Sequence, residues 1–545
     1  MRKWAVVAIL AAAQFVMVLD GTVMNVSIST VVVDLGTSVA AMQAAITFYT
    51  LTMAAFMLLG AKLGDVWGRR RAFVIGSCVY AVGSLTTALS PNIGVLMIGW
   101  SLIEGLGAVL VIPAIAALIA DNYEGRARIT SYAIIGAVSG AAVAAGPLIG
   151  GFVTTYFSWR YVFLSEVVIM AVVVGFTRLI SDPTGSARRS RIDALSVVLS
   201  ALGLLGIVLG MLQSKTWGWI IPLHSPEVFG VAVAPLGISL TTWLILGGIA
   251  LLVAFAARQR HLIAAGRSAL LDVSLLRIRR LRSGLSVLGA QYAITAALFF
   301  MVPVYLQMTL GLDALSTGIR IFPLSISLII FSIVGTRLAT IWSARRIVRL
   351  GQVILVLSSL VLLGTIDIKL DTLAFGIGMF TAGAALGLLA SQLGNVNMSS
   401  VGEDKSSEAG GLQGVFQNLG SSLGTALIGS VLMSTLAISF SAGVASSQLP
   451  DDVQQTVATA TEQGVQIIPA ASVEKIATDA GLSDTDAADL ATIYSSSQIQ
   501  ALRIAFLALV LLSLGTLFFS RGIPNDVLGR APSESPAAEP SKAGS

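Results

Sequence analysis

The chain has 545 residues, of which 55% are hydrophobic and only 11% are charged. Its mean hydropathy of +0.88 is too high for a chain that water must solvate, so the composition excludes a soluble globular protein. A net charge of +5 would suit an anionic partner such as nucleic acid. The positions of Lys and Arg explain this charge by membrane orientation instead, and we expect no nucleic-acid partner.

Apolar stretches recur from the N-terminus almost to the end of the chain. A hydrocarbon core of about 30 Å takes roughly 20 helical residues. The first stretch resembles a secretory signal, but it carries Asp20, continues past Val26 and lacks an A-x-A cleavage site, so we expect a retained helix. Membrane helices are predicted near residues 5–28, 44–64, 72–90, 94–120, 129–153, 161–181, 193–213, 240–260, 283–306, 318–339, 348–366, 373–395, 412–436 and 499–520. The fold class is therefore an all-α polytopic membrane protein with 14 transmembrane helices.

Most of the 33 Lys and Arg fall in alternate loops, which places both termini in the cytoplasm of a multi-pass protein of the cell membrane. The cytoplasmic connection 258–282 contains the basic strip RIRRLRS, which either binds anionic headgroups or is a plain solvated loop. The connection 439–497 is acidic and is predicted to form a small helical extracellular cap. The tail 521–545 is rich in Pro, Ser and Ala and is predicted to be disordered.

A repeat divides the chain into related halves. GAKLGDVWGRRR at 60–71 aligns with GTRLATIWSARR at 335–346, and each segment ends a helix at a basic turn. The organisation predicted is a six-helix bundle over 1–181, an inserted helix pair and linker over 182–282, and a second six-helix bundle over 283–520 that includes the cap. Halves of the same polarity predict a substrate cavity at their interface and transport by alternating access.

Three acidic residues lie inside predicted membrane helices. At 1.5 Å per residue, Asp20 lies about 12 Å, Glu104 about 15 Å and Glu166 about 9 Å below the outer surface. Acids in the membrane are more often functional than structural, and these favour cationic or neutral substrates. We expect all three in proton coupling, with Asp20 as the first candidate. The alternatives are that Asp20 only bonds a neighbouring helix, and that the two glutamates pair with Arg160 or Arg320 to close an external gate.

These motifs resemble the major facilitator superfamily, in its fourteen-helix drug:proton antiporter branch, over nearly the whole chain. The signature of the loop after helix 2 is matched at Leu63, Gly64, Asp65, Gly68, Arg69, Arg70 and Arg71, with departures at Ala61 and Val66. The resemblance implies a gate in which Asp65 accepts hydrogen bonds from a helix N-terminus or an Arg, while Gly68 permits a tight turn. The plainer interpretation is a basic turn that only obeys the positive-inside rule.

Helix 5 and helix 1 carry two further signatures of this family. The antiporter motif is matched at Gly146, Pro147, Gly150 and Gly151, which implies a hinge of small residues, although plain helix packing uses the same pattern. LDGTVMNVSI at 19–28 is similar to the branch's helix 1 signature and includes Asn25. Helix 4 departs from the family pattern, because Ser101 stands where an Arg is usual and Glu104 replaces a Gln.

Polar and aromatic side chains of helices 1 and 9–13 are candidates for the substrate cavity, because lipid cannot bond an amide. They are Asn25, Gln291, Tyr292, Phe299, Gln392, Asn395, Gln413 and Gln417. No phosphate-binding loop, H-E-x-x-H motif or Cys and His cluster is present in the sequence, so we expect no cofactor, no metal and no enzymatic activity.

The function predicted is a monomeric, proton-coupled exporter of small lipophilic compounds such as drugs. A dedicated exporter of one endogenous lipid or antibiotic metabolite remains an alternative, and a receptor or sensor that retains a transporter fold is a second.

Overall fold

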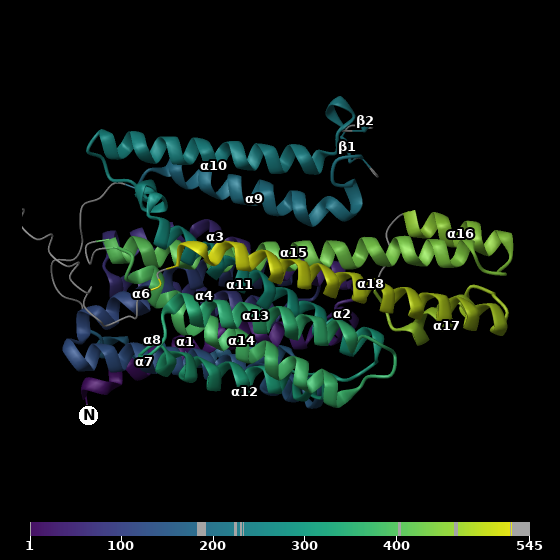
Figure 1. Ribbon diagram of the computed structural model, residues 1–545, viewed down its shortest axis with the longest axis horizontal. Helices are drawn as coiled ribbons and strands as arrows, with labels where there is room; N and C mark the ends of the chain where they lie inside the picture. The colour runs from purple at the N-terminus through teal and green to yellow at the C-terminus, as the bar shows by residue number, and fades with distance from the viewer. Residues whose placement is uncertain are drawn as a thin grey trace, which may run out of the picture.

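The protein is an elongated bundle of long helices (Figure 1). The computed structural model describes residues 2–181, 192–222, 226–228, 231–232, 234–401, 405–462, 467–523 and 525. Within these residues, 14 helical segments are long and apolar enough to cross a membrane, which confirms the predicted number. The tail from residue 526 onward, predicted to be disordered, lies outside the described residues.

The N-terminal half contains six spans. Its elements are α1 (Arg2–Val26), α2 (Ile28–Asp34), α3 (Val39–Trp67), α4 (Arg69–Ala88), α5 (Ile93–Leu96), the π-helix η1 (Met97–Glu104), α6 (Gly105–Asn122), α7 (Gly125–Tyr156), α8 (Arg160–Phe176) and the 3-10 turn η2 (Thr177–Leu179). The fourth span runs through α5, η1 and α6 without a break in the chain direction. Between α3 and α4 the chain turns at Gly68, whose φ of 94° lies in the region that favours glycine.

The C-terminal half also contains six spans. Its elements are η4 (Val273–Arg277), α11 (Arg279–Val304), the π-helix η5 (Tyr305–Thr309), α12 (Ala314–Leu338), α13 (Ala344–Gly364), α14 (Thr372–Met398), α15 (Ser406–Ala445), α16 (Asp451–Glu462), α17 (Ala470–Asp479), α18 (Asp484–Phe519) and η7 (Ser520–Gly522). Polar side chains cap the N-termini of several helices. At the start of α14, Asp371 accepts hydrogen bonds from the backbone N–H groups of Leu373 and Ala374, at 3.0 and 3.1 Å.

The inserted pair forms a separate layer along one side of the bundle (Figure 1). It consists of α9 (Ala194–Trp217) and α10 (Leu240–Ala264), joined by a short segment with β1 (Glu227–Val228), β2 (Val231–Ala232) and η3 (Pro235–Gly237). Strands β1 and β2 pair antiparallel, and they do not change the all-α class. The two helices approach closely at Gly203 and Gly248, where a Cβ on Gly248 would lie 2.6 Å from the Gly203 carbonyl oxygen.

Two helices extend beyond the membrane-spanning length. The 40 residues of α15 extend about 60 Å, roughly twice the hydrocarbon core. The helices predicted at 412–436 and 499–520 end too early at residue 436 and begin too late at residue 499. Apolar composition ends at the membrane, while α15 and α18 continue to pack on each other. Helices α16 and α17 complete this projection at the end of the bundle opposite the N-terminus, which we call the cap end (Figure 1).

Candidate functional site

The three acidic residues of the membrane helices meet at one buried point. Asp20 comes from α1, Glu104 ends η1, and Glu166 comes from α8, and none of the three is exposed at all. One carboxylate oxygen from each lies within 4.8 Å of the others. We call Asp20, Glu104 and Glu166 the carboxyl cluster. The structure thus brings together the three residues that the sequence singled out separately.

The π-helical segment η1 positions one side of the cluster. A π-helix has a wider turn than an α-helix, and such turns are frequent at functional sites. Trp100, four residues before Glu104, donates from Nε1 to both oxygens of Asp20, at 2.9 and 3.0 Å. Its indole ring stacks on Tyr49 with the ring centroids 4.8 Å apart and the planes 8° from parallel. Trp100 is therefore held on two sides, and it fixes the orientation of the Asp20 carboxyl group.

Helix α4 supplies the hydrogen bonds to the other side of the cluster. Ser84 and Tyr80 donate to Oε2 of Glu166 at 3.1 and 3.4 Å. Gly83 lets α4 approach, because a Cβ there would lie 2.5 Å from the backbone nitrogen of Glu104. Both oxygens of Glu104 and Oε1 of Glu166 have no hydrogen-bond partner among the described residues.

The arginines considered as partners of the glutamates bond elsewhere. Arg160 forms an ion pair with Asp34 and donates to the Ser90 carbonyl oxygen at 2.9 Å. Arg320 donates to the Ser316 carbonyl oxygen on its own helix at 3.2 Å. The expected arginine-to-glutamate gate is therefore absent from the described residues in this conformation. Asp34 was not singled out in the sequence.

The loop signature after α3 makes a different contact from the one expected. Asp65 is half-buried, and it has no hydrogen bond among the described residues. Arg69 instead pairs with Asp121 near the end of α6, at 2.5 Å, and donates to the Ala117 carbonyl oxygen at 3.4 Å. Arg69 opens α4, and α4 packs along α6, so its side chain reaches α6. The expectation for Asp65 is wrong in this conformation.

The other two arginines of the signature differ in exposure. Arg70 is half-buried and Arg71 is exposed. Neither forms an ion pair among the described residues. The contact between α4 and α6 in this loop therefore rests on Arg69.

The small residues of α7 lie between the two halves. A Cβ on Gly146 would lie 1.8 Å from Oγ1 of Thr22 in α1, and one on Gly150 would lie 2.9 Å from Val23. On the other side, a Cβ on Gly151 would lie 2.6 Å from the carbonyl oxygen of Ala314 in α12. The glycines thus let α7 pack closely against α1 and α12, because a side chain at these positions would collide with the neighbouring helix.

Pro147 of α7 also lies at the contact with α12, opposite Gly318. Helix α7 continues through Pro147, whose carbonyl oxygen would lie 2.2 Å from a Cβ added at Gly318 of α12. A side chain at Gly318 could not be accommodated without separating the helices.

Hydrogen bonds between the halves gather toward the cap end. Gln307 in η5 donates to the Val26 carbonyl oxygen at 2.7 Å and accepts from the Ser29 N–H at 3.2 Å. Gln43 in α3 donates to the carbonyl oxygens of Thr425 and Ala426 in α15, at 3.1 and 3.3 Å. The sequence analysis missed both glutamines, although a buried amide in an apolar helix is a signal that could have found them.

The substrate-cavity candidates are distributed over several environments. Asn25, Gln291 and Gln392 are buried and donate to the carbonyl oxygens of Gly21, Leu386 and Gly335, at 2.5, 3.3 and 3.0 Å. The bonds of Gln291 and Gln392 thus join neighbouring helices, whereas that of Asn25 stays within α1. Oδ1 of Asn25 and Oε1 of Gln291 remain unbonded among the described residues.

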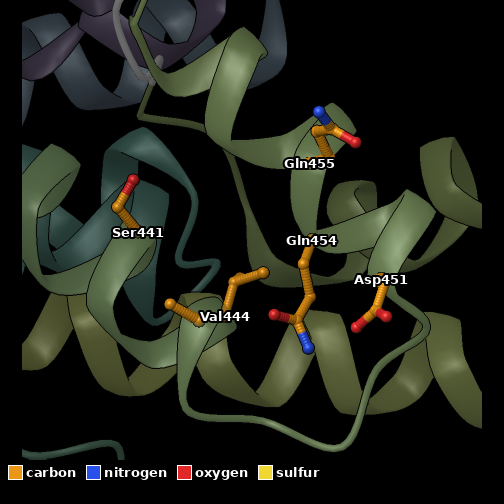
Figure 2. Close-up of a pocket in the computed structure, with 6 residues that line it drawn as sticks. Ser441, Val444, Asp451, Gln454 and Gln455 are labelled. Atoms are coloured by element: carbon orange, nitrogen blue, oxygen red, sulfur yellow. The ribbon is translucent and has the colours of Figure 1, made fainter.

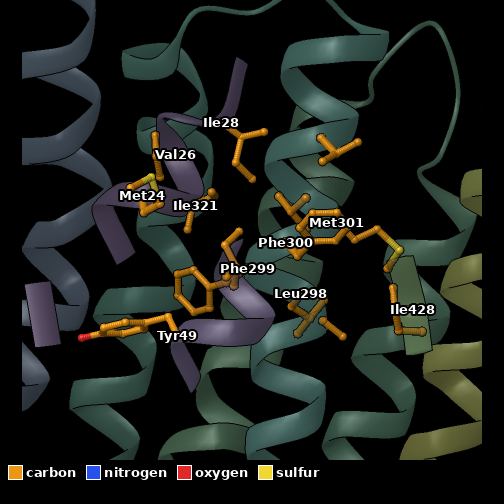
Figure 3. Close-up of a cluster of buried hydrophobic side chains, with 14 of the residues drawn as sticks. Met24, Val26, Ile28, Tyr49, Leu298, Phe299, Phe300, Met301, Ile321 and Ile428 are labelled. Atoms are coloured by element: carbon orange, nitrogen blue, oxygen red, sulfur yellow. The ribbon is translucent and has the colours of Figure 1, made fainter. Parts of the chain in front are cut away.

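The remaining candidates do not form one group. Phe299 lies in the buried apolar cluster of Figure 3 and lines a narrow gap with Leu298 and Ile321. Tyr292, Gln413 and Gln417 are half-buried, and Asn395 is exposed. We therefore find no single pocket among the described residues that contains all eight candidates.

A separate cleft lies in the projection at the cap end. It has a volume of about 370 Å³ and lies between the end of α15 and α16 (Figure 2). Its lining includes Ser441, Val444, Asp451 and Gln454, and it contains no residue of the carboxyl cluster. Gln454 donates to the Leu449 carbonyl oxygen at 2.9 Å, which joins α16 to the loop before it.

Fourteen spans, six before and six after the pair α9 and α10, with three buried acidic residues in the first six, define a polytopic membrane transporter. The chain belongs to the Major Facilitator Superfamily, whose profile matches residues 10–425. It is therefore a membrane transporter for small molecules and not an enzyme.

Individual relatives agree with this assignment. The probable actinorhodin transporter of Streptomyces coelicolor is 28% identical over 85% of this chain and 78% of that protein. The tetracenomycin C resistance and export protein of Streptomyces glaucescens is 25% identical over 98% of this chain and 94% of that protein. Among solved structures, an inward-facing, unoccupied bacterial homologue of the human lysosomal transporter Spinster shares the fold, with a TM-score of 0.59 and 14% identity over 96% of this chain and 98% of that one.

Proposed function

We propose that this protein is a proton-coupled antiporter that exports small lipophilic compounds, cationic or neutral, by alternating access. The observation that carries the proposal is the carboxyl cluster, in which three fully buried acids lie within 4.8 Å of one another. Their charges cannot all be present in an apolar interior, so the cluster must exchange protons or bind a cation as its surroundings change.

The donors around the cluster favour protons over a metal ion. Trp100 Nε1–H points at both oxygens of Asp20, and two hydroxyl groups donate to Oε2 of Glu166. These hydrogens occupy lone pairs of Asp20 and of Oε2 of Glu166 that could otherwise bind a divalent cation, and a buried N–H group beside a metal would be repelled.

The orientation that we propose places both termini in the cytoplasm and α16 and α17 outside. It rests on the positive-inside distribution of Lys and Arg, and the N-terminus lies at the end of the bundle opposite the cap end (Figure 1). In this orientation the hydrogen bonds of Gln307 and Gln43 close the outer side of the interface. The outer side of the interface is then closed in this structure.

The energetics allow export against a gradient. Each positive charge that moves inward releases about 2.3 kcal/mol per 100 mV. A tenfold substrate gradient costs about 1.4 kcal/mol. For a neutral substrate one proton per cycle is thus enough for useful export, and the pH gradient adds to the driving force. Exchange of one proton for a monocation moves no net charge, so the pH gradient alone drives that exchange.

The relatives favour an antibiotic as substrate. Their names refer to transport of actinorhodin and to export of tetracenomycin C. A dedicated exporter of one such metabolite is the second candidate that these names favour. Competition in a transport assay among chemically unrelated compounds separates it from a multidrug exporter, because a dedicated exporter is inhibited only by relatives of its own substrate.

The test is transport in proteoliposomes that hold the purified protein and an imposed pH gradient. We expect the gradient to drive accumulation of a lipophilic cation such as ethidium, and Asp20→Asn to abolish that accumulation. The matched control is Asp489→Asn, which changes an exposed carboxyl group on α18 in the same way. Accumulation by the wild type that is insensitive to the pH gradient, or full activity of Asp20→Asn, would refute the proposal.

A further inference from the structure

The hydrogen bonds to the cluster are distributed unequally over the six carboxyl oxygens. Both oxygens of Asp20 accept from the single N–H group of Trp100. Glu166 accepts two on Oε2 and none on Oε1, and Glu104 accepts none on either oxygen. Donors that point at an oxygen stabilise the ionised carboxylate, and their absence disfavours it. The cluster is therefore asymmetric, and its members are not interchangeable.

Glu104 is the member least able to carry a charge. Its side chain is fully buried, it points toward the two other acids, and neither of its oxygens has a partner among the described residues. A buried carboxylate without a donor is strongly disfavoured, whereas a protonated carboxyl group supplies its own donor to a neighbouring oxygen. The unbonded oxygens of Glu104 thus point to protons as the missing ligands of this site.

No positive side chain among the described residues offsets the cluster. The groups that face it are Trp100 from η1, Tyr49 from α3, and Tyr80 and Ser84 from α4, and all of them are neutral. The arginines of this half bond elsewhere, Arg160 to Asp34 and Arg69 to Asp121. Only protons or a cationic substrate can therefore balance the negative charge.

We propose that the cluster holds two protons, one on Glu104 and one on Oε1 of Glu166, while Asp20 remains the carboxylate that attracts the substrate cation. This inference rests on the proposed antiport, and it assigns proton binding to the two glutamates and attraction of the substrate cation to Asp20. Two protons enter from outside on the glutamates and leave to the cytoplasm when a cation approaches Asp20. The substrate class is then an organic cation, and export of a monocation moves one net positive charge inward.

The proton assignment is tested without transport, by infrared difference spectroscopy of the purified wild-type protein between acidic and alkaline pH. The carbonyl stretching band of protonated carboxylic acids reports the buried protons, and exchange into heavy water shifts it. We expect Glu104→Gln and Glu166→Gln each to remove about half of the buried band, and Asp20→Asn to leave it intact. Loss of the band in Asp20→Asn, or no change in Glu104→Gln, would overturn the assignment.

The stoichiometry is tested by the membrane potential at which net ethidium flux stops in proteoliposomes at a fixed pH gradient. We expect two protons per ethidium in the wild type, an electrogenic exchange with a defined stopping potential. Glu104→Gln, which keeps the side-chain size, should exchange one proton per ethidium, an electroneutral exchange whose flux does not respond to the membrane potential. Glu104→Asp restores the carboxyl group and should restore part of the second proton. One proton in the wild type would overturn this inference alone, whereas pH-independent flux would refute the antiport itself.

Discussion

Gln307→Leu is expected to open the outer side of the transporter. Gln307 bridges the halves through two buried hydrogen bonds, to the Val26 carbonyl oxygen at 2.7 Å and from the Ser29 N–H at 3.2 Å. Each bond contributes about 1 kcal/mol net, because water replaces it when the interface opens. Leucine keeps the volume and loses both bonds, so the closed state loses about 2 kcal/mol, and the ratio of open to closed molecules rises about 30-fold.

The assay is a distance measurement between spin labels at the cap end. Cys78 is the single cysteine of the chain, so Cys78→Ala gives a background free of other thiols. Labels at Val33→Cys, after α1, and at Lys369→Cys, between α13 and α14, report the separation of the two halves, and both positions are exposed. We expect the long-distance population to increase in Gln307→Leu.

The control for this measurement is Gln352→Leu. Gln352 is an equally buried amide that donates to the Thr516 carbonyl oxygen at 2.7 Å, but both residues belong to the C-terminal half. The reasoning fails if Gln307→Leu leaves the distance distribution unchanged, or if Gln352→Leu shifts it as far.

Three further predictions concern other contacts. Gly318→Val should abolish transport while the protein still inserts into membranes, because a Cβ there lies 2.2 Å from a backbone oxygen of α7; near-normal flux in vesicles would contradict it. Asp121→Asn and Arg69→Gln should be non-additive in a double-mutant cycle of transport, with a coupling of about 1 kcal/mol, and additive effects would show that the pair does not act as a unit. The Arg258 guanidinium beside Asp193 holds the pKa of that carboxyl group well below its usual range. Asp193→Asn should therefore lower the melting temperature at neutral pH, and the difference from wild type should vanish as the pH falls through the depressed pKa; an equal difference in acid would refute the ion pair.

The sequence alone predicted the membrane class and the number of spans, because both follow from local hydropathy. Its predicted helix ends were least accurate at residues 436 and 499, where α15 and α18 continue as helix beyond the apolar segment. Helix length outside the bilayer depends on packing between segments that are distant in sequence, and no local signal reports it.

The depths of Asp20, Glu104 and Glu166 in the membrane were estimated from the sequence with the rise of a regular helix, and they stay predictions. Their meeting within 4.8 Å could not be predicted from the sequence, since it depends on how α1, η1 and α8 converge. The partner of Arg69 was missed for the same reason, because the rotation of α4 against α6 decides whether it reaches Asp121.

What the sequence determined about this protein is thus the membrane environment and the number of spans. The two related halves and the residues expected to exchange protons stay predictions. The tertiary structure decided which side chains lie together: Trp100 and Glu104 share one π-helical segment, and Trp100 Nε1 donates to Asp20. Hydropathy and helical rise are properties of each segment alone, whereas the hydrogen bonds of a carboxyl group depend on every helix that packs around it.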